Sequence, residues 1–121
     1  MNGGPIDQAT FDRLVEMTGG ELDFVDELVD TYIEDGRNQV EGLRAALERG
    51  DTEALVRAAH SLKSSSVNVG ALALGDRCRA LEEAARAGAV PDAAERIDAI
   101  ASSFERVWTV LLDERARRAQ D

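Results

Sequence analysis

The sequence contains one histidine and one lysine, and these two residues lie three positions apart, at His60 and Lys63. On a helix, residues three apart are neighbours on one face. Neutral imidazole is a nucleophile near neutral pH, and an adjacent ammonium can stabilise the negative charge of a phosphoryl group. The pair therefore indicates a histidine that accepts a phosphoryl group. Hydroxyls at Ser64, Ser65 and Ser66 could donate further hydrogen bonds to that group.

The segment that carries His60 has the periodicity of an amphipathic helix over residues 52–68. At about 100° per residue, its apolar and small residues fall within an arc of about 100°, and His60 projects roughly 150° from the centre of that arc. The core stripe consists of Leu55, Ala58, Ala59, Leu62, Ser66 and Val69. The outward strip consists of Val56, His60, Lys63, Ser64 and Val67, with Arg57 one turn before His60. A strip that combines a nucleophile, a cation and apolar edges indicates a docking face with a reactive centre.

The remaining elements predict an all-α fold. Helical periodicity covers 6–17, 21–49, 72–87 and 91–116, and glycines separate these segments. Four long amphipathic helices with short connections predict an antiparallel up-down four-helix bundle. The short additional N-terminal helix is expected to cap one end. We expect one domain over residues 1–121, with 1–5 as a loose leader and 117–121 as a frayed tail.

Composition excludes several function classes for this chain of 121 residues. It has 24 acidic and 14 basic residues, a net charge of −10, which disfavours nucleic acid and membrane surfaces as partners. Residues 1–35 carry ten acids and one base. That segment is either a solvated helix face or a surface that steers a basic partner. A single cysteine, no apolar run of about 20 residues and no signal-peptide pattern predict a cytoplasmic protein.

The stretch from Ala59 to Ala71, which reads AHSLKSSSVNVGA, continues through Leu74 and Cys78 to Leu81 and Glu82. This pattern resembles the histidine-containing phosphotransfer (HPt) domains of bacterial multistep phosphorelays. The resemblance implies that His60 is the phosphorylated histidine, that Lys63 neutralises the phosphate and that Gly70 ends the site helix. It further implies that Glu82 hydrogen-bonds the other imidazole nitrogen and fixes the tautomer. Leu62 belongs to the matching stretch as a structural core position, whereas Ser64 departs from the glycine that many members of the family have there.

The resemblance implies a protein that relays a phosphoryl group between receiver-domain aspartates and His60. The expected partner is the receiver domain of a response regulator, a hybrid histidine kinase or both. The expected docking residues are Val56, Arg57, Ser64 and Val67. We expect a monomer without autonomous kinase activity, metal site or cofactor, and Mg²⁺ that comes with the receiver. The kinase, the direction of phosphate flow and the physiological output stay open.

Two other function classes are alternatives to phosphotransfer. A non-catalytic helical interaction module would keep the fold and the acidic surface, but it would make the proximity of His60, Lys63 and Glu82 incidental. A di-metal or haem enzyme is disfavoured, because the sequence has no Glu-x-x-His pair and its only histidine faces outward.

Overall fold

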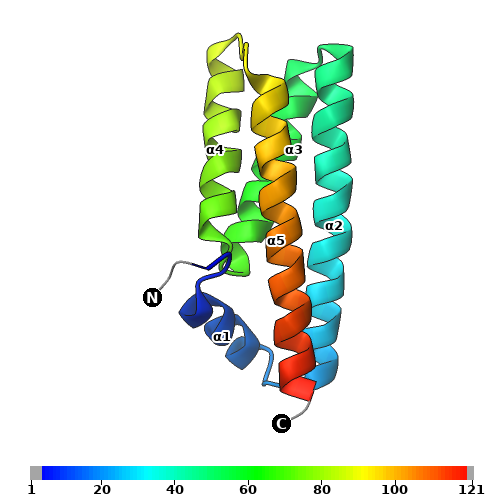
Figure 1. Cartoon of the computed structure of the whole chain (residues 1–121), viewed down its shortest axis with the longest axis vertical. Coiled ribbons are helices and arrows are strands. Elements are labelled where there is room, and N and C mark those ends of the chain that lie inside the picture. The colour runs from blue at the N-terminus through cyan, green and yellow to red at the C-terminus, as the bar shows by residue number, and fades with distance from the viewer. Residues whose placement is uncertain (1–3, 120–121) are drawn as a thin grey trace.

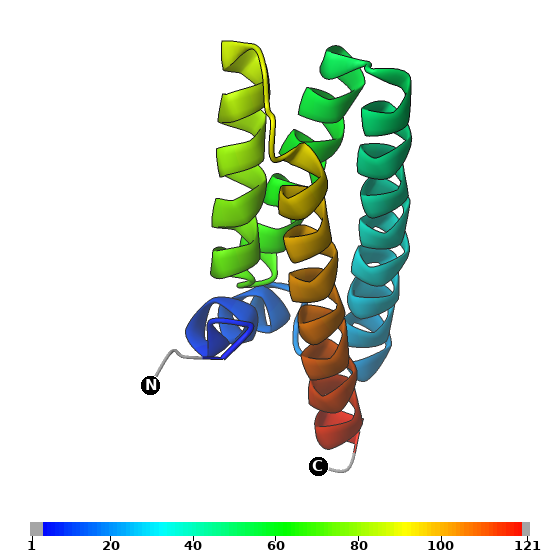
Figure 2. The ribbon, with the colours of Figure 1, turned by 45° about the horizontal axis from the view of Figure 1, so that its top comes forward.

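The computed structural model describes residues 4–119, and within that range it is entirely helical. Its helices are α1 (Gln8–Met17), α2 (Leu22–Arg49), α3 (Thr52–Asn68), α4 (Leu72–Ala87) and α5 (Ala93–Ala119). Helices α2 to α5 run alternately up and down side by side (Figures 1 and 2). Each packs on its neighbours in chain order, and α5 closes the bundle against α2. The predicted all-α antiparallel bundle is confirmed.

Strong local signals set the limits of the helix that carries His60. The Asp51 carboxylate accepts a hydrogen bond from the Ala54 N–H at 3.0 Å and caps the start of α3. Just before it, Gly50 ends α2 in the left-handed conformation with φ 65°. Gly70, with φ 91°, follows the last turn of α3. The bounds of α3 and α4 therefore agree with those expected from the sequence.

Helix α1 caps one end of the bundle, as predicted. The α3 and α4 helices have 17 and 16 residues and the α2 and α5 helices have 28 and 27, so the shorter pair ends well before the longer pair. Helix α1 lies below the ends of the shorter pair (Figures 1 and 2). It buries Phe11 and Val15. The Asp7 N–H donates to the Gly70 carbonyl at 2.7 Å, which ties α1 to the end of α3.

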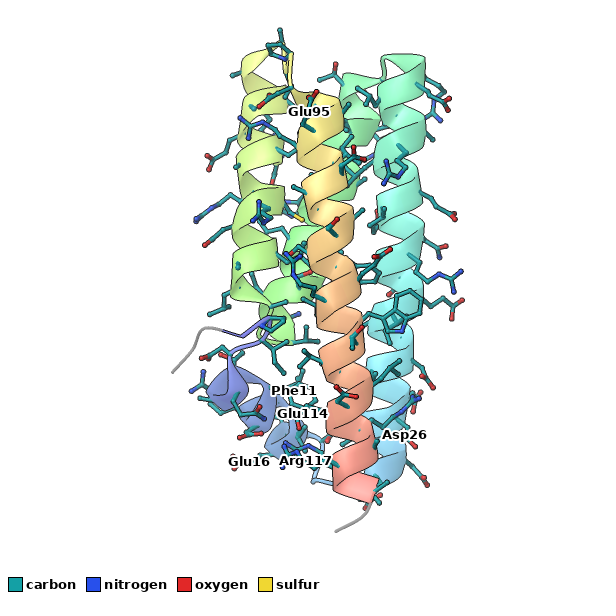
Figure 3. The ribbon with its side chains drawn as sticks, viewed as in Figure 1. Phe11, Glu16, Asp26, Glu95, Glu114 and Arg117 are labelled. Atoms are coloured by element: carbon teal, nitrogen blue, oxygen red, sulfur yellow. The ribbon has the colours of Figure 1, made fainter. Side chains whose placement is uncertain are left out.

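Helix α1 is also fastened to the end of α5. The Gln8 side-chain amide of α1 donates a hydrogen bond to the Glu114 carboxylate of α5, and Figure 3 labels Glu114 and Phe11 at this end of the bundle. The Arg118 guanidinium lies 2.6 Å from an Asp12 carboxylate oxygen and 5.4 Å from the centre of the Phe11 ring. These contacts show that α5 continues as an ordered helix through Ala119, beyond the predicted end at residue 116. Residues 1–3 and 120–121 of the predicted leader and tail lie outside the described residues.

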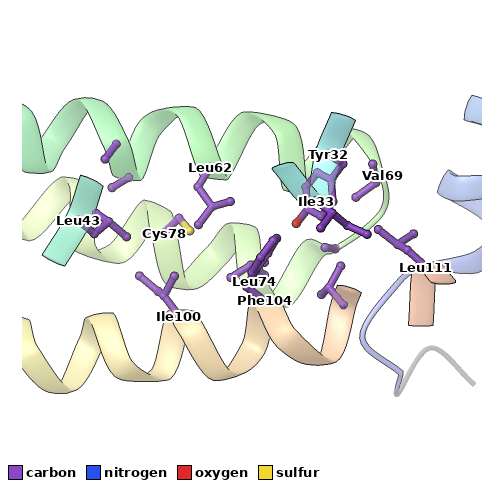
Figure 4. Close-up of a cluster of buried hydrophobic side chains, with 14 of the residues drawn as sticks. Tyr32, Ile33, Leu43, Leu62, Val69, Leu74, Cys78, Ile100, Phe104 and Leu111 are labelled. Carbon is purple, nitrogen blue, oxygen red and sulfur yellow. The ribbon is translucent and has the colours of Figure 1, made fainter. Parts of the chain in front are cut away.

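The core runs the length of the bundle and is built from the apolar stripes of all five helices. Figure 4 shows the part of it that lies between α2, α3, α4 and α5. Its largest fully buried side chains include Phe11, Leu43, Leu62, Leu74, Leu81, Ile97, Ile100 and Leu111. Apolar residues at spacings of three and four along α2 predict that Leu47 is buried, but Leu47 is 39% exposed. Ile33 and Ala46, which lie beside that predicted stripe, are buried.

Candidate functional site

His60 lies near the middle of α3 on the outside of the bundle, and its side chain is 54% exposed. Its position follows from its neighbours along the helix. Ala59 and Leu62 are fully buried in the core, so the turn that carries His60 is anchored on its inner side. The outward orientation expected from the helical periodicity is confirmed.

Glu82 reaches His60 from the neighbouring helix α4. Its Oε2 lies 3.1 Å from the imidazole Nδ1, and only 8% of its side chain is exposed. The adjacent Leu81 and the preceding Cys78 are fully buried, which places Glu82 on the flank of α4 that faces α3. The structure thus brings together the histidine and the carboxylate that the resemblance implied.

The close approach of α4 to α3 depends on a glycine. A Cβ atom added at Gly75 would lie 2.8 Å from Cγ2 of Val67 and 3.7 Å from the Lys63 carbonyl oxygen. The absence of a side chain there lets α4 pack against the turn of α3 that follows His60. This spacing is what allows the short Glu82 side chain to span the gap between the helices.

Two cations share the Glu82 carboxylate with His60. The Lys63 Nζ lies 3.2 Å from Oε1, and the Arg86 Nη2 and Nε lie 2.9 and 3.3 Å from Oε2. Burial raises the pKa of the Glu82 carboxyl, but the contacts with Arg86, Lys63 and His60 outweigh burial and hold that pKa at about 2. Glu82 is therefore ionised throughout the physiological pH range.

The ionised carboxylate decides which imidazole nitrogen carries the proton. A carboxylate can only accept hydrogen bonds, so the His60 Nδ1 beside it must be the donor. In the neutral ring, Nε2 then holds the lone pair. Nε2 makes no hydrogen bond to residues 4–119, and it belongs to a side chain that is half exposed on the outside of α3.

Lys63 occupies a different place from the one expected. The sequence put its side chain in the outward strip, whereas only 25% of it is exposed and its ammonium leans onto Glu82. The reason is electrostatic, because a buried carboxylate attracts a flexible cation on the next turn. In the structure, the Lys63 ammonium contacts the Glu82 carboxylate rather than pointing to solvent beside the His60 imidazole.

The expectation of a hydroxyl cluster at the site is only partly correct. Ser64 is exposed beside His60. Ser65 donates back to the Leu62 carbonyl at 3.2 Å, and the Ser66 hydroxyl forms a buried 2.8 Å hydrogen bond with the Tyr32 hydroxyl. Ser66 is a core residue, in agreement with its place on the predicted apolar stripe, and it cannot also serve a phosphoryl group.

The expected docking residues surround His60 on the surface of α3. Arg57 and Val67 are exposed, whereas Val56 is only partly exposed because it packs against the core. A shallow depression on the side of α3 that precedes His60 is lined by Val56 and by the charged residues Glu53, Arg57 and Arg86, together with Thr52 and Ala85. Apolar groups and charges of both signs therefore lie within about two helical turns of His60 on this side.

A larger groove lies between α1, α2 and the end of α3. It has a volume of about 580 Å³, and its lining includes the apolar side chains of Leu14, Phe24, Leu28 and Val69. Phe24 is 48% exposed. Glu27 and Asp35 of α2, together with Ser65 and Asn68 of α3, complete the lining. The acidic segment of the sequence thus borders an apolar groove next to the face that carries His60.

Gly70 and Leu62 have structural positions. An added Cβ at Gly70 would lie 2.7 Å from the Asp7 carbonyl oxygen, and its φ of 91° favours glycine independently. Leu62 is fully buried on the inner side of α3. Cys78 is fully buried as well, and burial raises the pKa of its thiol to about 12, in keeping with a core residue.

In residues 4–119, three or more His, Cys, Asp or Glu side chains nowhere gather in a way that could hold a metal ion. Among the described helices, none is long and apolar enough to cross a membrane.

Comparison with known proteins identifies the family. The family model of the Hpt domain matches residues 27–110, which include His60, Lys63, Glu82 and Arg86. The chain belongs to the Hpt domain family. It is also similar to the crystal structure of histidine-containing phosphotransfer protein B (HptB) from Pseudomonas aeruginosa PAO1, with 33% sequence identity and a TM-score of 0.88. The match covers 96% of this chain and 98% of the HptB chain. A search of curated proteins gave no match.

Sequence reasoning missed one residue of this Hpt domain site, Arg86. It lies four positions after Glu82 on α4, the spacing at which an acid followed by a base forms a favourable helical pair. That spacing could have indicated Arg86. The spacing alone does not distinguish Arg86 from the twelve other arginines of the sequence.

Proposed function

We propose that this Hpt domain carries a phosphoryl group on Nε2 of His60 and exchanges it with the phosphorylated aspartate of a receiver domain. The observation that carries this proposal is the contact between His60 Nδ1 and the ionised Glu82 carboxylate at 3.1 Å. It leaves Nε2 of the neutral ring unprotonated, on a half-exposed side chain at the outer face of α3. Membership of the Hpt family and similarity to a histidine phosphotransfer protein support the same function.

The chemical step needs only the groups that the two partners bring. The Nε2 lone pair attacks phosphorus, a P–N bond forms, and the bond between phosphorus and the aspartyl oxygen breaks. The aspartate leaves as a carboxylate with the bonding electron pair. The Nδ1 proton stays in place, so the phosphorylated ring becomes cationic, and the Glu82 carboxylate stabilises that positive charge. The reverse reaction follows the same path.

Lys63 supplies positive charge for the transferred group. Its ammonium lies one helical turn from His60 and 3.2 Å from Glu82, and a flexible side chain can turn from that carboxylate toward the phosphoryl oxygens. The proposal assigns Mg²⁺ to the receiver, since the Glu82 oxygens already face three cationic or donor groups. Lys63→Ala is expected to slow transfer while His60 remains the acceptor.

The docking face in this proposal covers Arg57, Ser64 and Val67 and the exposed part of Val56. It extends along α3 to the apolar groove, because Ser65 and Asn68 line that groove. An apolar centre with charged edges is typical of a protein interface. A receiver domain with apolar and basic residues around its active-site aspartate fits this surface best.

Several further properties belong to the same proposal. The domain acts as a cytoplasmic monomer and as an intermediate that has no kinase activity of its own. The single buried cysteine and the net charge of −10 support a reducing compartment and a protein partner rather than nucleic acid or a membrane.

The deciding experiment is phosphotransfer from a receiver domain loaded with a small acyl phosphate donor in the presence of Mg²⁺. Intact mass of this chain is the readout, and His60→Gln is the control. The wild type is expected to gain one acid-labile phosphoryl group and the variant none. Acid-labile phosphate on His60→Gln would contradict the proposal. No transfer from any of several receivers would favour the non-catalytic interaction module.

A further inference from the structure

Glu82 has more positive partners than its single charge requires. Lys63 lies 3.2 Å from Oε1, while Arg86 and the His60 Nδ1–H both point to Oε2. Arg86 places both Nε and Nη2 within 3.3 Å of that one oxygen. A buried carboxylate needs a cation, but one would serve. The second cation therefore calls for an explanation.

The proposed reaction changes the demand for positive charge at this site. A phosphoryl group brings between one and two negative charges to Nε2 of His60. Lys63 can neutralise that charge only if it leaves the Glu82 Oε1, where its ammonium now lies. If Lys63 were the sole counter-ion, its departure would leave an uncompensated buried carboxylate, which is strongly unfavourable. The carboxylate would then hold Lys63 back.

We propose that Arg86 is the resident counter-ion of Glu82 that frees Lys63 for the phosphoryl group. Arg86 acts through Glu82 and is therefore a positioning residue. In the resting state both cations share the carboxylate. When the phosphoryl group arrives, Lys63 turns to it, while Arg86 keeps Glu82 ionised and aligned with Nδ1. This inference rests on the proposed function and assigns a role to a residue outside the motif.

The local structure suits Arg86 to this role. Glu82 and Arg86 lie on one face of α4 with the acid first, the more favourable order for a pair four apart. The Arg86 side chain is 62% exposed, so it stays solvated along its length while its guanidinium reaches the buried Glu82 oxygen. Lys63 reaches Glu82 from α3 and contacts Oε1, whereas Arg86 contacts Oε2. Lys63 can therefore move away without disturbing the Arg86 contact.

The test uses the isolated protein and phosphoramidate, a small donor that phosphorylates histidine without a partner. Initial rates of phosphoryl uptake by His60 are measured by intact mass for wild type, Arg86→Met, Glu82→Gln and the double variant. We expect Arg86→Met to slow uptake about three- to tenfold, a usual coupling within one ion-pair network. In the Glu82→Gln background, where the neutral amide needs no counter-ion, the same substitution should change the rate less than about twofold.

Two variants control for charge and for the chemistry of the side chain. Arg79→Met removes the same charge from an exposed α4 arginine that pairs with Asp76, and it should leave the rate unchanged. Arg86→Lys keeps the positive charge and should retain most of the wild-type uptake rate. A thermal melt confirms that each variant is folded.

A second readout separates this inference from the proposed function. Because His60 is the only histidine, its two ring nitrogens give isolated ¹⁵N signals that report the tautomer. Arg86→Met should increase the Nε2–H form relative to wild type, with no donor present. If the wild type takes up no phosphate, the proposed function fails, and the tautomer still shows whether Arg86 aligns Glu82.

Three results would overturn the inference. The first is an uptake rate and tautomer that Arg86→Met leaves unchanged. The second is an equal slowing in the wild-type and Glu82→Gln backgrounds, which would mean that Arg86 contacts the phosphoryl group directly. The third is a defect seen only in transfer from a receiver domain, which would make Arg86 a partner contact.

Discussion

In the proposed phosphotransfer, the reactivity of His60 depends on Glu82, a residue that does not contact the phosphoryl group. Glu82 is ionised because its cationic partners outweigh its burial, and its ionisation puts the ring proton on Nδ1. An amide at the same position could also accept a hydrogen bond from Nδ1, but it would not balance the positive charge of the phosphorylated ring. Orientation and charge are therefore separable properties of one side chain.

That separation predicts different results for two substitutions of Glu82. Glu82→Ala removes both properties, and we expect phosphoryl uptake by His60 to fall about tenfold or more, because much of the ring shifts to the unreactive Nε2–H tautomer. Glu82→Gln should keep the wild-type tautomer and lose less activity. The measurement combines ¹⁵N signals of the single histidine with initial uptake rates. Equal losses in the two variants, with the tautomer unchanged in both, would show that orientation has no role.

The same carboxylate predicts how stability depends on pH. In the folded chain the Glu82 pKa is about 2, below its ordinary value of 4.5. A lowered folded-state pKa adds stability that is present above pH 4.5 and is lost as the pH falls toward 2. The size of this pKa difference corresponds to at most about 3 kcal/mol.

Urea unfolding of wild type and Glu82→Gln between pH 7 and pH 2.5 measures this contribution. We expect the stability of the wild type relative to the variant to decrease by about 1–3 kcal/mol as the pH falls from 5 to 2.5. The other acids are common to both proteins and cancel in the difference. A stability difference that stays constant over this range would show that Glu82 gains nothing from its ionised state.

At the scale of the helices, two glycines within α2 give opposite predictions. An added Cβ at Gly36 would lie 2.2 Å from the Phe104 ring, whereas one at Gly42 would lie 3.7 Å from the Ala58 Cβ, an ordinary contact. Both positions gain about 1 kcal/mol of helix propensity from alanine. Overpacking against the buried Phe104 ring should exceed that gain.

We therefore expect Gly36→Ala to lower the free energy of unfolding by about 1–2 kcal/mol and Gly42→Ala to raise it by up to about 1 kcal/mol. Urea denaturation of the two variants beside wild type is the measurement, and each serves as the control for the other. If Gly36→Ala were as stable as Gly42→Ala, α2 and α5 would have room to move apart at Phe104.

The helices also show what a sequence can and cannot predict. The bounds of α3 were predictable because Asp51 and Gly70 are strong local signals. The exposure of His60 followed from helical periodicity alone. Periodicity does not give the distance between helices, so it could not show that Lys63 leans onto Glu82 or that Ser66 bonds to Tyr32. Glu82 was placed by resemblance, because contacts between α3 and α4 depend on packing at Gly75.

At the scale of the whole molecule, the uneven distribution of charge should affect how fast the protein associates with a partner. Residues 1–35 hold ten acids and one base, and in the fold Glu27 and Asp35 border the apolar groove beside the face of His60. Opposite charges on a partner would raise the rate of encounter, and salt would weaken that effect because the screening length shortens to about 3 Å at 1 M. A merely solvated acidic helix would show no such dependence.

We expect the second-order rate of phosphotransfer from a cognate receiver to fall about tenfold between 20 mM and 500 mM salt. Glu27→Gln combined with Asp35→Asn should lower the rate at low salt and flatten the salt dependence. The control pair, Glu95→Gln with Asp113→Asn, makes the same charge change on α5, which packs on α2 and α4. Uptake from the small donor should be unaffected by either pair, since no protein encounter is involved. Equal effects of the two pairs would mean that net charge, and not the groove beside His60, governs the encounter.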